Sequence, residues 1–485
     1  MTTAPPQPGP GSGPRPALLL SSATVVDTRD GTLATDTDVL VRDGRIAEVR
    51  PGITAPAGAV TVDARGTYVV PGFVDMHAHP LDRRTDPTGA LELMLAHGVT
   101  GFRQMSGSLD LLRRRTAGTL DLPAASPALL ATPGALLTPA NAGTSARAVA
   151  AVREQHAAGA DFIKVGLVTP EVFFDAQAEA LRLGLPIVGH LPAGIDTAEA
   201  SRRGMKSIEH LGPGVGLFAC CSTDGHHVQE AAGSRPKIKL PPFRIPFLEL
   251  LLGRIIAKAV VNPVNLNRPA DIEILDHALG TFDADLARTM AERFAADGTW
   301  HVPTLIRERT SQLCDDPSFR ADPDLRYVAP SVIKDWEAAA EKFARFPPEA
   351  RATFRAAYRR QLELTKLLDD AGVRMLAGSD SSGAAWEVPG AALHHEFDEL
   401  ARAGLGPLRI LQMTTLLPAE FLGTTGTAGT VAPGRNADLV LLDGNPVESV
   451  DNLHRITGVV RAGHHHPAAD LHALKERIAA RRSVH

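Results

Sequence analysis

Two histidines one residue apart, His77 and His79, have the type and spacing to do chemistry together. They close the stretch VVPGFVDMHAHP (69–80), in which apolar β-type runs flank a Pro-Gly turn. Side chains at positions i and i+2 of a strand point to the same face, so both imidazoles are expected to project from the end of a buried strand. A bare pair of this kind is more often a surface feature. The apolar strand before it favours a divalent metal site instead.

Four more residues with metal-binding side chains end short apolar runs further along: Lys164, His190, His210 and Asp380. Each residue also has a structural explanation that needs no metal. A lone buried histidine is usually satisfied by hydrogen bonds, and Asp380 could cap a helix. Lys164 is the hardest to dismiss, because a buried ammonium is costly without a partner. Burial favours the neutral amine, which can react with carbon dioxide. The resulting carbamate is an anionic oxygen ligand able to bridge two cations.

The elements that must position these residues follow two patterns of secondary structure. Residues 17–68 contain short β-rich runs with hairpin signals at Asp30-Gly31 and Asp43-Gly44. From His77 onward, helical patterns alternate with short apolar runs, which predicts βα units on a parallel sheet. The polar residues fall at the carboxyl ends of the strands, where a (β/α)8 barrel gathers its active site.

Towards the carboxyl end of the chain, the last barrel strand is expected at 373–380. Short strands then return in 429–463 and are expected to complete the sheet begun by residues 17–68. The tail 464–485 is expected to be a helix with a histidine-rich start, His464–His466, read as surface residues in preference to a metal site.

The alternation breaks at an insertion of about 211–281, which holds Cys220-Cys221, His226-His227 and an amphipathic piece at 246–261. Such an insertion after a barrel strand can form a lid or a substrate pocket. The alternatives are a variable excursion, a subunit contact or a membrane-surface segment.

Composition narrows the function classes. A formal charge of −5 with no long basic tract argues against a nucleic-acid partner. Three cysteines, two of them adjacent, imply no disulfide framework, and the absence of an apolar run of 18 residues argues against a membrane span. The Pro/Gly-rich segment 1–16 lacks the regions of a signal peptide and is read as a disordered lead on a cytoplasmic protein.

Taken together, VVPGFVDMHAHP, DFIKV, PIVGHL, SIEHL, HVPTL, MLAGSD and GTVAPGRNADLVLLDGNP resemble the metal-dependent amidohydrolase superfamily. Within it, the chain is similar to the imidazolonepropionase-like and Xaa-Pro dipeptidase-like (prolidase-type) branch. The resemblance implies an α/β fold, a (β/α)8 TIM-like barrel with a small β-sandwich domain built from both chain ends. The expected parts are a lead at 1–16, β-sandwich at 17–70 and 426–485, and the barrel at 71–425.

The resemblance also implies a ligand set for two divalent metal ions. Zinc is expected first, with manganese, cobalt or iron as alternatives. His77 and His79 with Asp380 would hold the more buried ion, His190 and His210 the second, and Lys164, as N6-carboxylysine, would bridge both. Asp380, Lys164 and His210 would form the catalytic set, with Asp380 moving a proton from water to the leaving amine. Candidates for substrate contact are Arg103, His226, His301 and His394, and a structural or solvent-facing role is the alternative for the three histidines.

These assignments lead to a binuclear hydrolase that cleaves an amide bond in a dipeptide-like compound, an N-acyl amino acid or a cyclic amide. A lactone, ester or phosphotriester hydrolase remains an alternative on the same site. Lys164 counts against a mononuclear deaminase, and the six filled ligand positions count against a non-catalytic scaffold. Arg103-Gln104 stands where many relatives read Arg-Asp. The expected partner is a small-molecule substrate, and relatives suggest a homo-oligomer.

Overall fold

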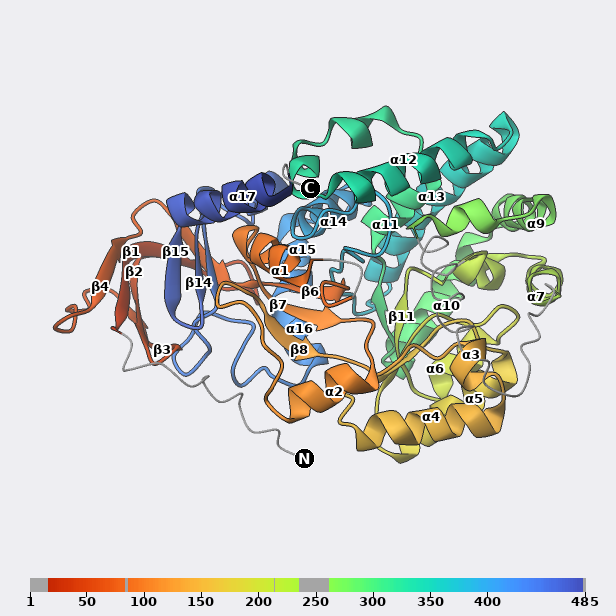
Figure 1. Ribbon diagram of the computed structural model, residues 1–485, viewed down its shortest axis with the longest axis horizontal. Helices are drawn as coiled ribbons and strands as arrows, with labels where there is room; N and C mark the ends of the chain where they lie inside the picture. The colour runs from red at the N-terminus through yellow and green to blue at the C-terminus, as the bar shows by residue number, and fades with distance from the viewer. Residues whose placement is uncertain (1–15, 83–85, 213, 235–260, 483–485) are drawn as a thin grey trace.

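The computed structural model describes residues 16–82, 86–212, 214–234 and 261–482 (Figure 1). Their strands form three sheets, one mixed and two parallel. In Figure 1 the mixed sheet lies at the left, and the parallel strands lie in the middle among the helices. Nearly all of the predicted lead and of the predicted amphipathic piece at 246–261 lies outside the described residues.

The mixed sheet joins the two ends of the chain. Its order is β15-β14-β13-β5-β1-β2-β3, with β4 pairing with β1. The join is the antiparallel pair of β13 and β5, in which Leu441 lies opposite Val69. The turn Asp43-Gly44 connects β2 to β3 with both residues at positive φ (50° and 74°), as a two-residue hairpin requires. The strand bounds are β1 Leu18–Val26, β2 Leu33–Arg42, β3 Arg45–Arg50, β4 Val60–Asp63, β5 Tyr68–Pro71, β13 Leu439–Leu442, β14 Ile456–Arg461 and β15 His464–Pro467.

The two parallel sheets carry the predicted βα rhythm. One has the order β6-β7-β8 and the other β12-β11-β10-β9. Their strands are short. They are mostly buried, except β8, in which three of the four residues are half-buried, and such burial is typical of parallel strands. The bounds are β6 Phe73–Ala78, β7 Val99–Gln104, β8 Ala128–Ala131, β9 Ile163–Val165, β10 Ile187–Gly189, β11 Met205–Glu209 and β12 Trp300–Val302.

Helices connect these strands and begin at local signals in the sequence. Thr144 and Thr169 cap α4 and α5 by accepting hydrogen bonds from backbone N–H groups, and Asp283 caps α10 in the same way. The helices along this part are α1 Pro87–Ala96, α2 Leu109–Thr116, α3 Pro139–Ala142, α4 Ser145–Ala157, α5 Pro170–Arg182, α6 Thr197–Arg202, α10 Ala284–Asp297, α11 Leu305–Gln312, α12 Pro330–Ala344, α13 Pro348–Asp370, α14 Ala391–Arg402, α15 Pro407–Thr414 and α16 Leu416–Phe421.

The segment 373–380 is not the regular strand that the sequence predicts. It makes isolated parallel bridges instead, from Met375 to His301 and from Ser381 to Ala78. The reason is the buried side chain of Asp75, which accepts hydrogen bonds from both the backbone N–H and the hydroxyl of Ser379. A backbone donor that would extend the strand ladder is therefore used by a side chain.

The tail also differs from the prediction at its start. His464–Pro467 form strand β15, antiparallel to β14, and the helix α17 begins only at Ala468 and ends at Arg482. The turn before β15 places Ala462 and Gly463 at positive φ (49° and 79°), which reverses the chain into a hairpin. The predicted helical start was therefore wrong by four residues.

The described parts of the insertion are helical. They are the 3₁₀ helix η1 Gly216–Cys221, α7 Gly225–Gly233, the 3₁₀ helix η2 Pro263–Leu266 and α9 Pro269–Gly280. The remaining 3₁₀ helices are η3 Pro317–Ala321, η4 Pro323–Tyr327 and η5 Val450–His454. None of the helices in the described ranges is both long and apolar enough to cross a membrane.

Candidate metal centre

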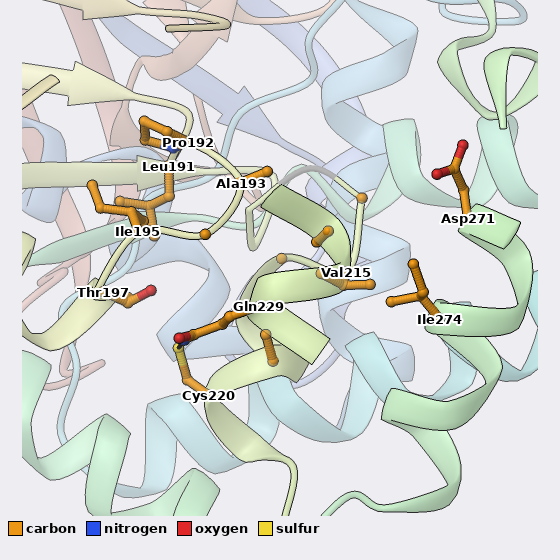
Figure 2. Close-up of a pocket in the computed structure, with 15 residues that line it drawn as sticks. Leu191, Pro192, Ala193, Ile195, Thr197, Val215, Cys220, Gln229, Asp271 and Ile274 are labelled. Carbon is orange, nitrogen blue, oxygen red and sulfur yellow. Dashed lines mark hydrogen bonds between the residues drawn. The ribbon is translucent and has the colours of Figure 1, made fainter. Parts of the chain in front are cut away.

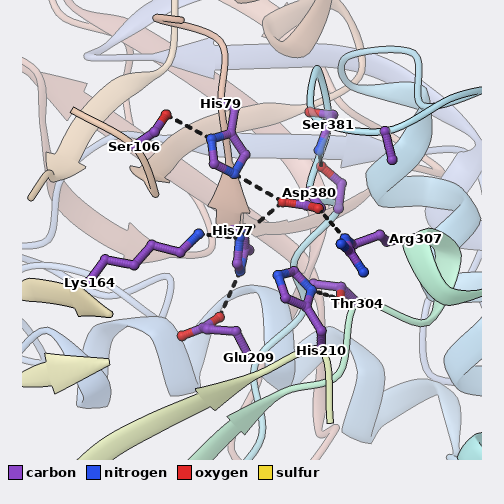
Figure 3. A network of polar contacts seen from close by, with 12 residues as sticks. His77, His79, Ser106, Lys164, Glu209, His210, Thr304, Arg307, Asp380 and Ser381 are labelled. Atoms are coloured by element: carbon purple, nitrogen blue, oxygen red, sulfur yellow. Dashed lines mark hydrogen bonds and ion pairs between the residues drawn. The ribbon is translucent and has the colours of Figure 1, made fainter. Parts of the chain in front are cut away.

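The ends of the parallel strands bring together side chains that are far apart in the sequence (Figure 3). His77 lies in β6 and Lys164 in β9, and His210 directly follows β11. Asp380 enters from the bridged segment 373–380, where its backbone N–H donates to the carbonyl of His77. His190, which directly follows β10, lies 5.2 Å from His210 between ring centroids. The structure thus gathers all six predicted ligand positions at one end of the parallel strands.

Two imidazole nitrogens converge on a single carboxylate oxygen. His77 Nε2 and His79 Nε2 each lie 3.0 Å from Asp380 Oδ1. The ligand atoms of these three residues all lie within 4.8 Å of one another, and no other such group of histidine, cysteine or acidic residues occurs in the described ranges. Two ligands on one zinc ion are roughly 3–3.5 Å apart, given bonds of about 2 Å, so the spacing fits a shared cation.

The tautomer of His77 supports the same interpretation. Its Nδ1 lies 2.7 Å from Glu209 Oε2. Burial alone would raise the pKa of Glu209, but the Arg103 charge and the His77 contact lower that pKa to about 2. An ionised carboxylate can only accept, so Nδ1 carries the proton and Nε2 presents a lone pair to Asp380. The facing lone pairs of Nε2 and Oδ1 are stabilised by a nearby cation, which can be a metal ion or the Lys164 ammonium, 3.1 Å from Nε2. A carboxylate behind a histidine is a common support for a metal ligand.

Glu209 is fixed in turn by Arg103. The guanidinium donates from NH2 to Glu209 Oε1 at 3.0 Å and from Nε to the carbonyl of Met76 at 2.6 Å. Both side chains are completely buried. A buried ion pair is costly unless its hydrogen bonds are satisfied, and here Ser207 also donates to Glu209 Oε1 at 2.6 Å.

The other two histidines present free lone pairs as well. His210 Nδ1 lies 2.6 Å from Thr304 Oγ1, whose own proton goes to the carbonyl of Pro303. Nδ1 is therefore the donor and Nε2 of His210 is unprotonated. His190 Nε2 is buried without a hydrogen-bond partner among the described residues. Burial lowers the pKa of both rings, for His190 to about 3, so both are neutral and suited to binding a metal.

Lys164 has the environment that the sequence suggests. The side chain is buried, and Nζ lies 3.1 Å from His77 Nε2. Burial lowers the pKa of Lys164 to about 8, against the opposing pull of Asp380 and Glu209. A far larger fraction of this amine is therefore neutral near pH 7 than for an exposed lysine.

Arg307, at the start of α11, contacts the far side of Asp380. Its Nε lies 2.6 Å from Asp380 Oδ2, while NH1 donates to Glu308 Oε1 at 2.9 Å. The two oxygens of Asp380 thus have separate partners, with Oδ1 facing the histidines and Oδ2 facing the guanidinium (Figure 3). This ion pair orients the carboxylate towards His77 and His79.

The backbone at these strand ends is strained. His210, Thr304 and Asp380 all have left-handed φ values, 60°, 46° and 55°, which cost of order 1 kcal/mol or more each for residues other than glycine. Close packing adds a further constraint, because a Cβ on Gly378 would lie 2.6 Å from the Cβ of His77. Only glycine lets the bridged segment approach β6 closely enough to aim Asp380 at the histidines.

A pocket lies between the insertion and the loop that follows His190 (Figure 2). One wall is the loop 191–197, which directly follows His190. The facing walls come from η1, α7 and α9, through residues that include Val215, Gln229 and Ile274. The insertion therefore packs against the loop that directly follows the predicted ligand His190.

The four residues assigned to substrate contact lie in different surroundings. Arg103 is buried and bonded to Glu209, as described above. His301 is buried in β12 with neither ring nitrogen hydrogen-bonded to a described residue. His226 is exposed on α7 beside Glu230, and His394 lies on α14, where its Nε2 donates to the carbonyl of His97.

Two residues of the centre were missed by the sequence reasoning. Glu209 precedes His210 in SIEHL, and a carboxylate inside an apolar strand is a signal of a buried partner. That partner, His77, lies 132 residues away. Arg307 gives no such signal, because an arginine on a helix is usually at the surface.

Comparisons with known proteins point to one superfamily. The model of the amidohydrolase family matches residues 274–465. A curated relative, the dihydroorotase of Pelobacter propionicus, is 36% identical over 99 residues, which is 20% of this chain and 23% of that protein. The chain therefore matches less than a quarter of the length of this relative.

Whole-chain likeness comes from solved structures. Bottromycin amidohydrolase is 26% identical with a TM-score of 0.68, covering 96% of this chain and 91% of that one. A Xaa-Pro dipeptidase with methionine bound in its active site has a TM-score of 0.59 at 16% identity, covering 93% and 100%. The second likeness bears on the fold alone.

Proposed function

We propose that this chain, which belongs to the amidohydrolase superfamily, is a metal-dependent hydrolase that cleaves the carbon–nitrogen bond of an amide. The observation that carries the proposal is the convergence of His77, His79 and Asp380 at the strand ends. The neutral rings of His190 and His210 and the buried amine of Lys164 lie around them. Bottromycin amidohydrolase, which is 26% identical and similar over nearly the whole chain, supports an amide substrate.

The scaffold that we infer is a closed (β/α)8 barrel. Seven strands, β6 to β12, form the two parallel sheets, and the segment 373–381 would be the eighth. Isolated parallel bridges at the gaps support closure: Leu137 to Val165 between β8 and β9, His301 to Met375, and Ser381 to Ala78. All of these lie in the order that a continuous ring of strands requires.

We infer two metal positions in this ring. His77 and His79 through Nε2, together with Asp380 Oδ1, would hold one divalent ion. His190 and His210, with their unprotonated nitrogens, would hold the second. Bound ions of this kind supply Lewis acidity that lowers the pKa of water and polarises a carbonyl oxygen. Zinc is the first candidate, because imidazole and carboxylate ligands suit it, and manganese, cobalt and iron remain open to test.

Lys164 would join the two positions as a carbamate. The neutral amine attacks carbon dioxide and loses a proton, which forms a new N–C bond and leaves an anionic carboxylate on Nζ. The lowered pKa of Lys164 and its 3.1 Å contact with His77 Nε2 support this step. The modification would also remove an ammonium from beside two cations, where it would be strongly repelled.

Asp380 is the residue that we assign to proton transfer. It would take a proton from the attacking water as the C–O bond forms, and deliver it to the amide nitrogen as the C–N bond breaks. Arg307 would hold Oδ2 during this exchange, and Glu209 would keep the proton of His77 on Nδ1. The pocket between the loop 191–197 and the insertion is the candidate entrance for substrate.

The direct test is a substrate screen on metal-loaded protein. Dipeptides, N-acyl amino acids and cyclic amides would be compared with lactones, esters and phosphotriesters under the same conditions. We expect amide cleavage that depends on metal and is abolished by His79→Asn. Turnover restricted to lactones or phosphotriesters would move the proposal to those bonds. Metal-independent turnover that survives His79→Asn would contradict the proposed centre.

A further inference from the structure

A second cluster of histidines surrounds a cavity away from the candidate metal centre. The cavity has a volume of about 260 Å³ and lies between α1, α14, α17, η4 and η5. His394, on its wall, contacts Phe73 at the start of β6, whereas His77 lies near the end of the same strand. The cavity is therefore at the opposite end of β6 from the metal centre. The polar side chains that line it are His97, Asp324, His394, His395, His454, His472 and Lys475.

Two of these side chains have unused hydrogen-bonding capacity. His394 is 5% exposed, its Nε2 donates to the carbonyl of His97, and its Nδ1 has no partner among the described residues. Nδ1 is therefore a bare acceptor inside the cluster. Lys475 donates to His97 Nε2 at 2.9 Å, and no described carboxylate forms an ion pair with it. An ammonium has three donors, so two of them remain to be used.

The arrangement does not favour a metal ion. His97 is held with its Nδ1 proton on the carbonyl of Leu93, and its Nε2 accepts from the ammonium of Lys475. His454 is paired with Asp398 at 2.9 Å. In the described ranges the histidine, cysteine and acidic groups close enough to share an ion are confined to the metal centre. The cavity offers one ammonium, at Lys475, and two acceptors, His394 Nδ1 and the Asp324 carboxylate. One free imidazole lone pair does not make a metal site.

We propose that this cavity binds a phosphate group together with a hydroxyl, that is, inorganic phosphate, whose dianion keeps one hydroxyl, or a phosphate monoester whose organic group carries a hydroxyl. Lys475 Nζ would donate to the anionic oxygens, and His394 Nδ1 would accept from the hydroxyl. Asp324, whose Oδ2 lies 3.9 Å from His97 Nε2, stands on the same wall as a second acceptor. His395 and His472, which are more exposed, would add donors at the mouth.

The size of the cavity agrees with this class of ligand. A water molecule occupies about 30 Å³ of liquid, and pockets for drug-sized ligands begin at about 300 Å³. A phosphate with a short organic group falls between these limits. Ala96, Ala391, Ile456 and Leu471 supply apolar lining for such a group.

The cavity is expected to distinguish phosphate from sulfate, and this difference in affinity can be measured on the unmodified protein. Sulfate matches phosphate in shape but carries no hydroxyl near neutral pH. It would therefore leave His394 Nδ1 unpaired and place a sulfate oxygen, which can only accept, opposite the Asp324 carboxylate, which can also only accept. Unpaired acceptors reject such analogues strongly. Calorimetric titration with inorganic phosphate and with sulfate should therefore give at least tenfold weaker binding of sulfate. Equal affinity would overturn the role of His394 and Asp324.

Variants separate this cavity from the metal centre, where phosphate can also bind. Lys475→Met keeps the aliphatic stem and removes the charge, and we expect it to weaken phosphate binding at least tenfold. His79→Asn, at the metal centre, and Lys342→Met, an exposed lysine on α12, should leave this binding unchanged. Unchanged binding in Lys475→Met, or no saturable binding of phosphate and glycerol phosphate, would overturn the proposal. Tighter binding of glycerol phosphate than of phosphate would identify an ester as the occupant.

Discussion

The two histidine clusters at opposite ends of β6 use the same side chain for different chemistry. At the metal centre, His77 and His79 have their outer nitrogens fixed by Glu209 and Ser106, so their inner nitrogens face Asp380. At the cavity, the nitrogens of His97 are used by a backbone carbonyl and by Lys475. A metal site therefore depends on which groups fix each ring behind the ligand atom, and not on the number of histidines.

The largest effect is expected from Asp380→Asn. The amide cannot accept a proton from water and loses the charge that pairs with Arg307. Positioned proton transfer contributes about 10²–10⁴-fold to rate, so kcat/KM should fall by at least that factor, and metal content should fall as well. His394→Asn, in the other cluster, is the matched control and should keep both. Equal losses in the two variants would show that the clusters do not differ as described.

Lys164→Ala should lower metal content and activity together, by about 100-fold for activity, because both metal positions lose their shared ligand. Short carboxylic acids added to the variant should restore part of the activity by replacing the carbamate. Metal analysis and initial rates, with and without acetate, measure this. Full activity in Lys164→Ala would contradict the bridging role.

Glu209→Gln tests the group behind His77. The amide can donate to Nδ1 and so favours the wrong tautomer, and loss of such a support typically costs 10–100-fold in metal affinity or activity, so we expect about that loss. The variant also leaves Arg103 as a buried charge without its partner, which costs about 3–5 kcal/mol of unfolding free energy. Urea denaturation and metal titration give the two values separately. Wild-type metal affinity in Glu209→Gln would contradict the role of Glu209 in supporting His77 as a metal ligand.

Gly378→Ala should have the smallest effect on chemistry and a clear effect on stability. The new Cβ meets the Cβ and backbone nitrogen of His77 at 2.6 and 2.8 Å, and overpacking of this kind costs about 1–3 kcal/mol. Gly426→Ala is the control, since nothing lies within 4 Å of its Cβ position. Equal thermal stability of both variants would mean that the bridged segment can move away from β6.

The sequence was informative where local pattern and chemistry coincide. His77, Lys164 and Asp380 each end an apolar run, and the alternation of runs and helices was enough to predict their common end of the sheet. The sequence did not predict long-range contacts such as Glu209 with His77 and Arg307 with Asp380, because no local spacing encodes them. The same limit applies to residues 373–380, where the side chain of Asp75 takes the hydrogen bonds of Ser379.

The second cluster of histidines, around the cavity, could not be predicted from the sequence. His394 and His97 come from helical segments without an unusual pattern, and only tertiary contacts reveal that one nitrogen of His394 is unused. The sequence offers His394 only as a candidate for substrate contact, with a structural or solvent-facing role as the alternative. In the structure it lies beside Lys475 from the carboxyl-terminal helix, whose packing against α1 could not be inferred from either segment alone.

The binuclear centre is tested by the metal content per chain, measured by elemental analysis on protein purified without chelator. We expect about two equivalents of a divalent transition metal in the unmodified chain and in His394→Asn, and a clear loss of metal in His79→Asn. About one equivalent would contradict the bridged pair and leave only the site at His77, His79 and Asp380. No metal, with reconstitution also failing, would contradict the proposed centre altogether.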